Sequence, residues 1–266
     1  MSRLQDTFAR LRDRRDHGLV TYVTAGDPDL ARSRDILRAL ARGGADVLEI
    51  GVPFSDPVAD GPAIQRAAER ALAHGTHLGT VLDLVAGLRA ELAAPVVLFT
   101  YVNPVLRMGL DAFTARAAEA GIDAVLLLDL PIEEAETTKA ALDARGLDQI
   151  FLISPTTSDS RLREAARLGR GFLYAISRLG VTGTRDRVAD TAAPLVRRIR
   201  AITSLPVALG FGISRPEHVE EVTAFADAAV VGSAIVDRIA QAAASGADPA
   251  MEVEAFVRWL KGQVQA

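Results

Sequence analysis

Cysteine is absent from the 266 residues of this chain, which excludes a disulfide framework, a thiolate nucleophile and a cysteine-based metal site. Lysine is nearly absent, because Lys139 and Lys261 are the only lysines among 30 basic residues. Lys139 lies in a glutamate-rich segment with a helical pattern and Lys261 lies near the C-terminus, so neither is expected to be a buried Schiff-base lysine. Reaction chemistry must therefore come from carboxylates, hydroxyls, the four histidines or the backbone.

Long apolar runs and an excess of positive charge are also missing. The longest apolar stretches, such as residues 124–128, have the length of a strand rather than of a membrane span. The N-terminal segment carries Arg and Asp and lacks the apolar core of a signal peptide. The formal net charge of -4 does not favour binding to nucleic acid or to an anionic membrane. We therefore expect a cytoplasmic protein with no nucleic-acid partner and no membrane partner.

Short apolar runs alternate with helix-length segments throughout the chain, which is the pattern of repeated strand–helix units. The predicted strands are Leu19–Val23, Asp46–Ile50, Val96–Phe99, Ala124–Leu128, Gln149–Ile153, Phe172–Ala175, Val207–Leu209 and Ala228–Val231. Eight such units predict the α/β class and a single (β/α)8 TIM-barrel domain over residues 1–266. An open doubly wound sheet would show the same alternation, but no G-x-G-x-x-G motif follows the first strand and no linker divides the chain.

Several segments are expected to add to the plain barrel. Residues Met1–Arg15 predict an extra N-terminal helix that caps the bottom of the barrel. The loops Gly51–Gly61, after the second strand, and Ser177–Asp190, after the sixth, are unusually long. Barrel function is carried by such loops, so both are candidates for the site. Residues Ser214–Glu217 match a capping box and predict the start of a helix.

Glu49 is the first candidate for chemistry. Alternation along the second strand places Val47 and Glu49 on one face and Leu48 and Ile50 on the other. Because the apolar pair should meet helices, Glu49 is expected to point into the barrel, where burial raises a carboxyl pKa and suits it to general acid catalysis. The alternative is a buried ion pair with an arginine.

The loop after the second strand supplies two more carboxylates, Asp56 and Asp60. Three prolines and two glycines between residues 51 and 62 restrict its backbone, so the loop is expected to have a defined shape. For either aspartate the alternative reading is an Asx-turn or a helix N-cap. The sequence does not decide between that reading and a catalytic role.

Two glycine-containing turns after the seventh and eighth strands, Gly210–Ser214 and Val231–Ala234, are candidates for a phosphate site. Glycine lets backbone N–H groups approach an anion, and a helix that begins near Ser233 would direct its positive end toward the same place. Residues Gly180–Gly183 in the sixth loop are expected to add donors or a lid. His74 and His77 are separated by a glycine and a threonine with no carboxylate nearby, so we predict no metal site.

In combination these segments resemble the α subunit of tryptophan synthase. Residues 48–62, Leu-Glu-Ile-Gly-Val-Pro-Phe-Ser-Asp-Pro-Val-Ala-Asp-Gly-Pro, match the family's hallmark of a strand ending in Glu, a Gly-Val-Pro-Phe-Ser-Asp-Pro loop and a second Asp. Further motifs occur in the family's order over most of the chain, at Thr24–Pro28, Tyr101–Pro104, Asp129–Pro131, Ile153–Thr157, Gly180–Gly183, Gly210–Ile213 and Gly232–Val236. The resemblance implies retro-aldol cleavage of indole-3-glycerol phosphate to indole and glyceraldehyde 3-phosphate.

The resemblance also assigns roles to residues. Glu49 would protonate indole C3 and accept the hydroxyl proton of the glycerol chain, and Asp60 would stabilise the positive charge at the indole N–H. The implied substrate-binding residues are Tyr22, Ile64, Leu126, Tyr174, Thr182 and Phe211. The implied phosphate-binding residues are Gly183, Gly212, Gly232 and Ser233.

The family's partner is a β subunit that carries pyridoxal phosphate and uses the indole for L-tryptophan synthesis. The resemblance therefore implies an α2β2 complex, no cofactor in this subunit, and contacts from Asp56 and the Asn103–Pro104 loop. Three other functions are compatible with the residues: a different phosphosugar barrel enzyme such as an isomerase or epimerase, a stand-alone lyase that releases indole, and a barrel that only activates its partner. The presence of both Glu49 and Asp60 argues against the last of these.

Overall fold

The computed structural model describes residues 2–176, 188–210 and 212–263. Its strands β1 to β8 form a closed barrel in which each strand is parallel to its neighbours and β8 pairs with β1. The strands are β1 Gly18–Thr24, β2 Val47–Gly51, β3 Val96–Thr100, β4 Ala124–Leu127, β5 Asp148–Ile153, β6 Leu173–Ile176, β7 Val207–Gly210 and β8 Ala228–Val231. Each predicted strand overlaps an observed one, so the predicted TIM barrel is confirmed.

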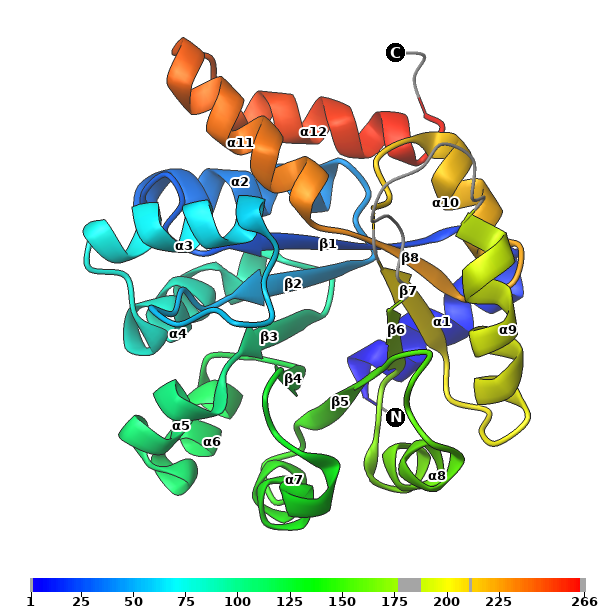
Figure 1. The fold of residues 1–266 in the computed structure, drawn as a ribbon. Coiled ribbons are helices and arrows are strands. Elements are labelled where there is room, and N and C mark those ends of the chain that lie inside the picture. Colours follow the sequence, from blue (N-terminus) through cyan, green and yellow to red (C-terminus); the bar gives the residue numbers. More distant parts are fainter. Residues whose placement is uncertain (1, 177–187, 211, 264–266) are drawn as a thin grey trace.

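Helices surround the strands (Figure 1). They are α1 Arg3–Arg14, α2 Leu30–Arg42, α3 Pro62–Ala73, α4 Leu78–Leu88, α5 Val102–Met108, α6 Leu110–Glu119, α7 Ala135–Asp143, α8 Asp159–Leu168, α9 Val188–Arg200, α10 Pro216–Thr223, α11 Ser233–Ser245 and α12 Pro249–Leu260. The barrel closes at its outer layer where α12 packs against both α2 and α11. Among the residues that the structure describes, no helix has the length and apolar character needed to cross a membrane.

Helix starts follow ordinary capping chemistry. The Asp29 side chain accepts the N–H of Arg32 at 2.8 Å and begins α2, and the His77 ring caps α4 by accepting from Gly79. The capping box predicted at Ser214–Glu217 is wrong. Helix α10 begins one residue later, with Arg215 as its N-cap and no side-chain cap, because Pro216 occupies the first helical position.

Alternate side chains of each strand face the barrel interior. The interior cluster contains Val20, Tyr22, Val47, Val97, Phe99, Ala124, Leu126, Ile150, Phe172, Ala208, Ala228 and Val230. The intervening residues of the same strands, such as Leu48 and Ile50, belong to the second cluster, which they form with the helices. The predicted two-residue alternation of β2 is therefore confirmed.

The predicted N-terminal helix exists as α1 and covers the bottom of the barrel. Its buried residues Leu4, Phe8 and Leu11 belong to the interior cluster, and the rings of Phe8 and Phe172 lie 5.5 Å apart. Because Phe172 directly precedes β6, this contact is at the N-terminal end of the strands. The barrel is thus closed at the end opposite to the long loops.

Aspartates placed just before strands hold that lower end together. The carboxylates of Asp46, Asp123 and Asp227 precede β2, β4 and β8, and each accepts a backbone N–H from the preceding strand at 2.8 Å. Lys261 forms an ion pair with Asp46 at 2.9 Å, while Lys139 forms one with Asp143 on α7. Both lysines therefore serve ion pairs outside the barrel interior.

Candidate active site

Glu49 lies inside the barrel near the C-terminal end of β2, as its position in the strand predicted. Its side chain is buried, it pairs in register with Tyr22 of β1 and Val97 of β3, and Gly51 ends the strand two residues later. Neither carboxylate oxygen has a hydrogen-bond partner among the described residues. The alternative of a buried ion pair with arginine is therefore wrong for this part of the chain.

Burial raises the pKa of Glu49 to about 8, because the charged carboxylate would lose its hydration without gaining a partner. At neutral pH Glu49 is therefore mostly protonated and can give a proton to a group in the barrel mouth. A fully buried acid with no partner is costly to the fold, and such cost is typical of a functional position.

Asp60 is held by a tyrosine rather than by a helix end. The Tyr101 hydroxyl donates to Asp60 Oδ2 at 3.1 Å and accepts the N–H of Ala59 at the same distance. Burial raises the pKa of Asp60 to about 6, although the hydrogen bond from Tyr101 acts to lower it. The N-cap of α3 is Gly61, with no side-chain cap, so the alternative reading of Asp60 as a helix cap is wrong.

Asp56, the other aspartate of this loop, points into solvent. Its carboxylate accepts the hydroxyl of the neighbouring Ser55 at 2.6 Å, and the residue is exposed. Nothing in its surroundings brings it to Glu49 or Asp60. The two aspartates of the loop therefore occupy different environments.

Two tyrosines of the barrel, Tyr22 on β1 and Tyr174 on β6, respond to the charge of Glu49. Burial raises the pKa of Tyr22, and the charges of Asp60 and Glu49 raise it further. Desolvation likewise raises the pKa of Tyr174, with Glu49 as the next cause. These influences place both phenols within electrostatic reach of Glu49.

Glycine creates the space that each tyrosine occupies. A Cβ atom added to Gly51 would lie 2.2 Å from the Tyr22 hydroxyl oxygen, and one added to Gly210 would lie 2.5 Å from that of Tyr174. No side chain larger than hydrogen fits at either place without moving a phenol. The glycines at the ends of β2 and β7 therefore shape the mouth of the barrel.

The apolar wall that the sequence predicted is partly brought together. Leu126 and Tyr22 belong to the interior cluster, and Ile64 and Tyr174 pack against it. The rings of Tyr22 and Phe99 meet edge to face at 5.0 Å. Thr182, Gly183 and Phe211 were also predicted to bind substrate or phosphate, but these three lie outside the described residues.

The predicted phosphate residues after β7 and β8 lie where their strands end. Gly212 has a φ of +71°, a left-handed conformation that glycine adopts without strain. Gly232 is the N-cap of α11 and Ser233 is its first residue, and among the described residues no side chain caps this helix. The N–H of Ile235 donates to the carbonyl oxygen of Gly232 at 2.8 Å, so the N–H groups of Ser233 and Ala234 are the ones that could bind an anion.

Tyr101 is the residue whose role the sequence did not reveal. In the sequence it is only the first residue of the Tyr101–Pro104 motif, whereas in the structure its hydroxyl binds Asp60. The available signal was its place directly after β3, the strand that pairs with β2. Within residues 2–176, 188–210 and 212–263, no group of three or more His, Asp or Glu side chains is arranged to hold a metal ion.

Comparison with known families and proteins gives a consistent result. The family model described as tryptophan synthase alpha chain matches residues 8–265. The tryptophan synthase alpha chain of Solibacter usitatus is 49% identical over 261 residues, covering 98% of this chain and 97% of its own. That of Geobacter sulfurreducens is 49% identical and covers 98% of each chain.

Solved structures agree with the sequence comparison. Tryptophan synthase subunit alpha from Legionella pneumophila has a TM-score of 0.92 at 38% identity, covering 99% of this chain and 98% of its own. A chain of tryptophan synthase from M. tuberculosis, in an aminoacrylate-bound form, has a TM-score of 0.88 at 33% identity, with full coverage of both chains. The predicted family is confirmed.

Proposed function

Because this chain belongs to the tryptophan synthase alpha chain family, we propose that it is the lyase subunit that cleaves indole-3-glycerol phosphate to indole and glyceraldehyde 3-phosphate. The observation that carries this proposal is Glu49, an inward and buried carboxyl group whose oxygens have no hydrogen-bond partner among the described residues. We also propose that residues 1–266 form one domain.

Glu49 is the proposed acid and base. With its pKa raised to about 8, it begins protonated and gives its proton to indole C3. The resulting carboxylate then takes the proton of the hydroxyl on the adjacent glycerol carbon. The bond between that carbon and C3 breaks, its electron pair returns to the indole ring, and the carbon becomes the aldehyde. Glu49 ends as it began, protonated.

Asp60 is the proposed electrostatic partner of the ring nitrogen. Protonation at C3 leaves a positive charge on the indole nitrogen, and a carboxylate with a pKa of about 6 is mostly ionised at neutral pH. Tyr101 fixes the position of Asp60 by donating to Oδ2. The two acids thus differ in charge at pH 7, as their different roles require.

The substrate phosphate is proposed to bind at the start of α11, at Gly232 and Ser233, with Gly212 and Gly183 beside it. The open N–H groups and the positive helix end support this place. Ser233→Asp is expected to raise KM by adding a negative charge beside the anion. An unchanged KM would remove Ser233 from the phosphate site.

Tyr22, Ile64, Leu126, Tyr174, Phe211 and Thr182 are proposed to surround the indole ring. The interior cluster that contains or contacts the first four supports this, because a flat aromatic body needs an apolar wall.

The activity test follows indole release from indole-3-glycerol phosphate with the matching β subunit present. Wild type is expected to release indole, whereas Glu49→Gln and Asp60→Asn should lower kcat by roughly 10²- to 10⁴-fold. Glu69→Gln, which alters an exposed carboxylate on α3, is the control. An inactive wild type would refute the lyase assignment, and a fully active Glu49→Gln would refute the proposed acid.

An alpha chain implies a beta-subunit partner, and we propose an α2β2 complex in which pyridoxal phosphate belongs to that partner and this subunit holds no cofactor. The loop after β2 and helix α5 support a docking surface. Val58 and Leu106 are 86% and 66% exposed, although both are apolar. Between these two elements lies a cavity of about 480 Å³ lined by Phe54, Pro104 and Met108, among others.

This surface adjoins Asp60 through Tyr101, whose ring packs on Phe54 at 5.0 Å between centroids. Asp56 and Asn103 are exposed on the same two elements and are proposed contacts. The expected Asn103–Pro104 loop is wrong in one respect, since both residues belong to the first turn of α5, where proline is tolerated.

Size-exclusion chromatography with a matching β subunit tests the docking surface. Val58→Asp and Leu106→Asp are expected to weaken complex formation. Met251→Asp is the matched control, because Met251 is 71% exposed but lies on α12. Equal loss of the complex in all three variants would contradict the proposed surface, and a wild type that never associates would favour a stand-alone lyase. The cytoplasmic location stays a prediction.

A further inference from the structure

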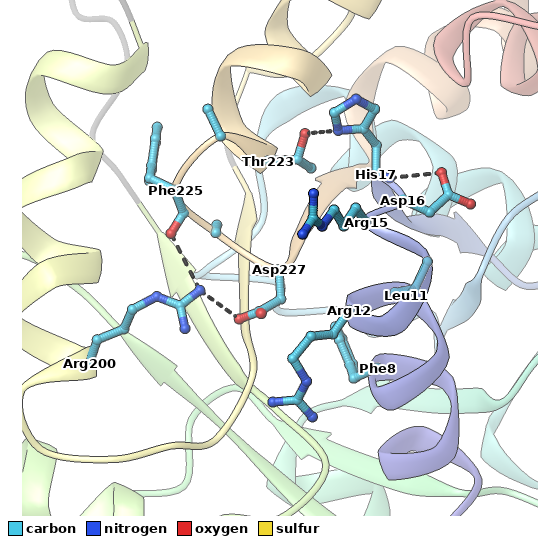
Figure 2. A pocket seen from close by; sticks show the side chains of 12 residues that line it. Phe8, Leu11, Arg12, Arg15, Asp16, His17, Arg200, Thr223, Phe225 and Asp227 are labelled. Carbon is cyan, nitrogen blue, oxygen red and sulfur yellow. Dashed lines mark hydrogen bonds and ion pairs between the residues drawn. The ribbon is translucent and has the colours of Figure 1, made fainter.

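A second cavity lies at the bottom of the barrel, at the opposite end from Glu49. It has a volume of about 440 Å³ and is formed where the end of α1 meets the end of α9 and the segment between α10 and β8. We call it the basal cavity. Figure 2 shows the side chains of Arg12, Arg15 and Arg200 reaching into it, from α1 and the residue after it on one side and from α9 on the other.

Two of these arginines, Arg12 and Arg15, are unpaired within the described part of the chain. The side chains of Arg12 and Arg15 make no hydrogen bond and no ion pair with the described residues, although acidic side chains line the same cavity. Arg200 differs, since its guanidinium donates to Asp227 at 3.0 Å and to the carbonyl oxygen of Phe225 at 3.4 Å. The cavity therefore holds positive charge that its own residues leave uncompensated.

Its two carboxylates are already engaged elsewhere. Asp227 accepts the N–H of Val207 in addition to Arg200, so it is bound into the end of the barrel. Asp16 accepts the N–H of His17 at 2.8 Å and lies 3.8 Å from the ammonium group of Lys261. With three arginines and two aspartates in its lining, the cavity keeps a net positive charge.

A histidine adds a further polar group with a defined orientation. The Thr223 hydroxyl oxygen lies 2.5 Å from His17 Nδ1 and 2.7 Å from the carbonyl oxygen of Val219. The contact engages Nδ1, and when Nδ1 accepts from Thr223 the proton of the ring is on Nε2, which can then donate to an anion. His17 directly precedes β1, which places it beside the arginines at the cavity wall.

The backbone of Arg15 is also unusual. Its φ of +53° is the single left-handed value among the non-glycine residues that the structure describes. Arginine there is less favourable than glycine, because its Cβ crowds the backbone. This conformation ends α1 and directs the Arg15 side chain into the cavity (Figure 2).

We propose that the basal cavity binds a small organic anion, with a phosphate or carboxylate group between Arg12, Arg15 and His17 and an apolar body against Phe225. Arginine suits both kinds of anion because its planar donor group matches two oxygens at once. The side chain of Phe225, which is only partly buried, lines the same cavity and gives an apolar body a surface to contact.

The competing explanation is that these arginines only stabilise the C-terminal end of α1. Cations in the last turn of a helix interact favourably with its dipole, and Arg12 and Arg14 both lie there in α1. That explanation predicts that replacing any arginine of the last turn changes anion binding to the same extent. An anion site in the basal cavity instead predicts that only the replacement of cavity-lining arginines weakens binding.

The test measures binding of phenyl phosphate and of benzoate by isothermal titration calorimetry. It uses the full chain carrying Ser233→Asp, so that the phosphate site proposed at α11 does not contribute. Benzyl alcohol is the neutral probe and inorganic phosphate is the anion without an apolar body. We expect phenyl phosphate or benzoate to bind and benzyl alcohol not to bind, and the stronger of the two anions identifies the acidic group.

In this background, Arg12→Gln combined with Arg15→Gln is expected to weaken binding by roughly 10- to 100-fold, the value of one charge-assisted hydrogen bond or more. The matched control combines Arg10→Gln with Arg14→Gln, which removes two charges from the same helix outside the cavity wall. Thermal unfolding checks that both variants fold. The proposal is overturned if neither anion binds, if both double variants weaken binding equally, or if inorganic phosphate binds as tightly as the stronger of the two aromatic anions.

Discussion

Replacing Glu49 with glutamine is expected to stabilise the protein at neutral pH. The pKa of Glu49 is about 8 in the folded chain, whereas an exposed glutamate has 4.5. Between these values the folded chain binds more protons than the unfolded one, so the free energy of unfolding falls as the pH rises, by up to about 1.36 kcal/mol per pH unit. From pH 5 to pH 7 the free energy of unfolding of wild type is expected to fall by roughly 2.5 kcal/mol because of Glu49. The variant Glu49→Gln lacks this titrating group and should not show the decrease.

The assay is urea unfolding of wild type and Glu49→Gln at pH 5 and pH 7. The difference in free energy of unfolding between the two proteins should grow by roughly 2.5 kcal/mol in favour of the variant. Comparing two pH values removes the fixed difference between an amide and a protonated acid. Glu69→Gln is the control, because Glu69 is exposed to solvent. Parallel pH dependence of wild type and Glu49→Gln would show that Glu49 is ionised in the folded protein and would refute the argument.

Two further changes probe the mouth of the barrel. Tyr101→Phe removes the hydrogen bond that lowers the pKa of Asp60, so the acidic limb of the pH–kcat profile, expected near 6, should move up by about one unit; a limb that stays in place would contradict this. Gly210→Ala would place Cβ 2.5 Å from the Tyr174 hydroxyl oxygen and should cost about 1–3 kcal/mol in urea unfolding. Gly61→Ala, with no atom within 4 Å of the added Cβ, should change stability by less than about 0.5 kcal/mol, and equal losses would show that crowding of Tyr174 is not the cause.

The strands and the inward direction of Glu49 could be predicted because both depend on local alternation. The side chains of residues 47–50 alternate between the interior and the exterior of the barrel in any strand. Once the apolar face that packs on the helices is identified, the direction of Glu49 follows. The identity of the family followed from residues 48–62 for a similar reason, since the motif is continuous in sequence.

The partner of Asp60 could not be predicted in the same way. Tyr101 and Asp60 are 41 residues apart, and their contact depends on the path of the whole loop after β2. The prediction of Ser214 as a helix N-cap was wrong for a local reason. Pro216 is the first helical residue, so Arg215 is the N-cap. Pairings across the barrel mouth and exact helix starts thus require the folded chain, whereas strand faces do not.

The two proposed acids are held in place by different kinds of structure. Glu49 belongs to a strand that is hydrogen-bonded on both sides within a closed barrel, so few substitutions could move it without harming folding. Asp60 belongs to a surface loop that is held near its end by the Tyr101 hydroxyl and by Gln65, whose side-chain amide donates to the Asp60 carbonyl oxygen at 2.8 Å. Variation, natural or in a laboratory library, can therefore accumulate between residues 52 and 60 and adjust one carboxylate while the other keeps its place. A search for variants with altered turnover or altered response to a partner would best begin in that loop.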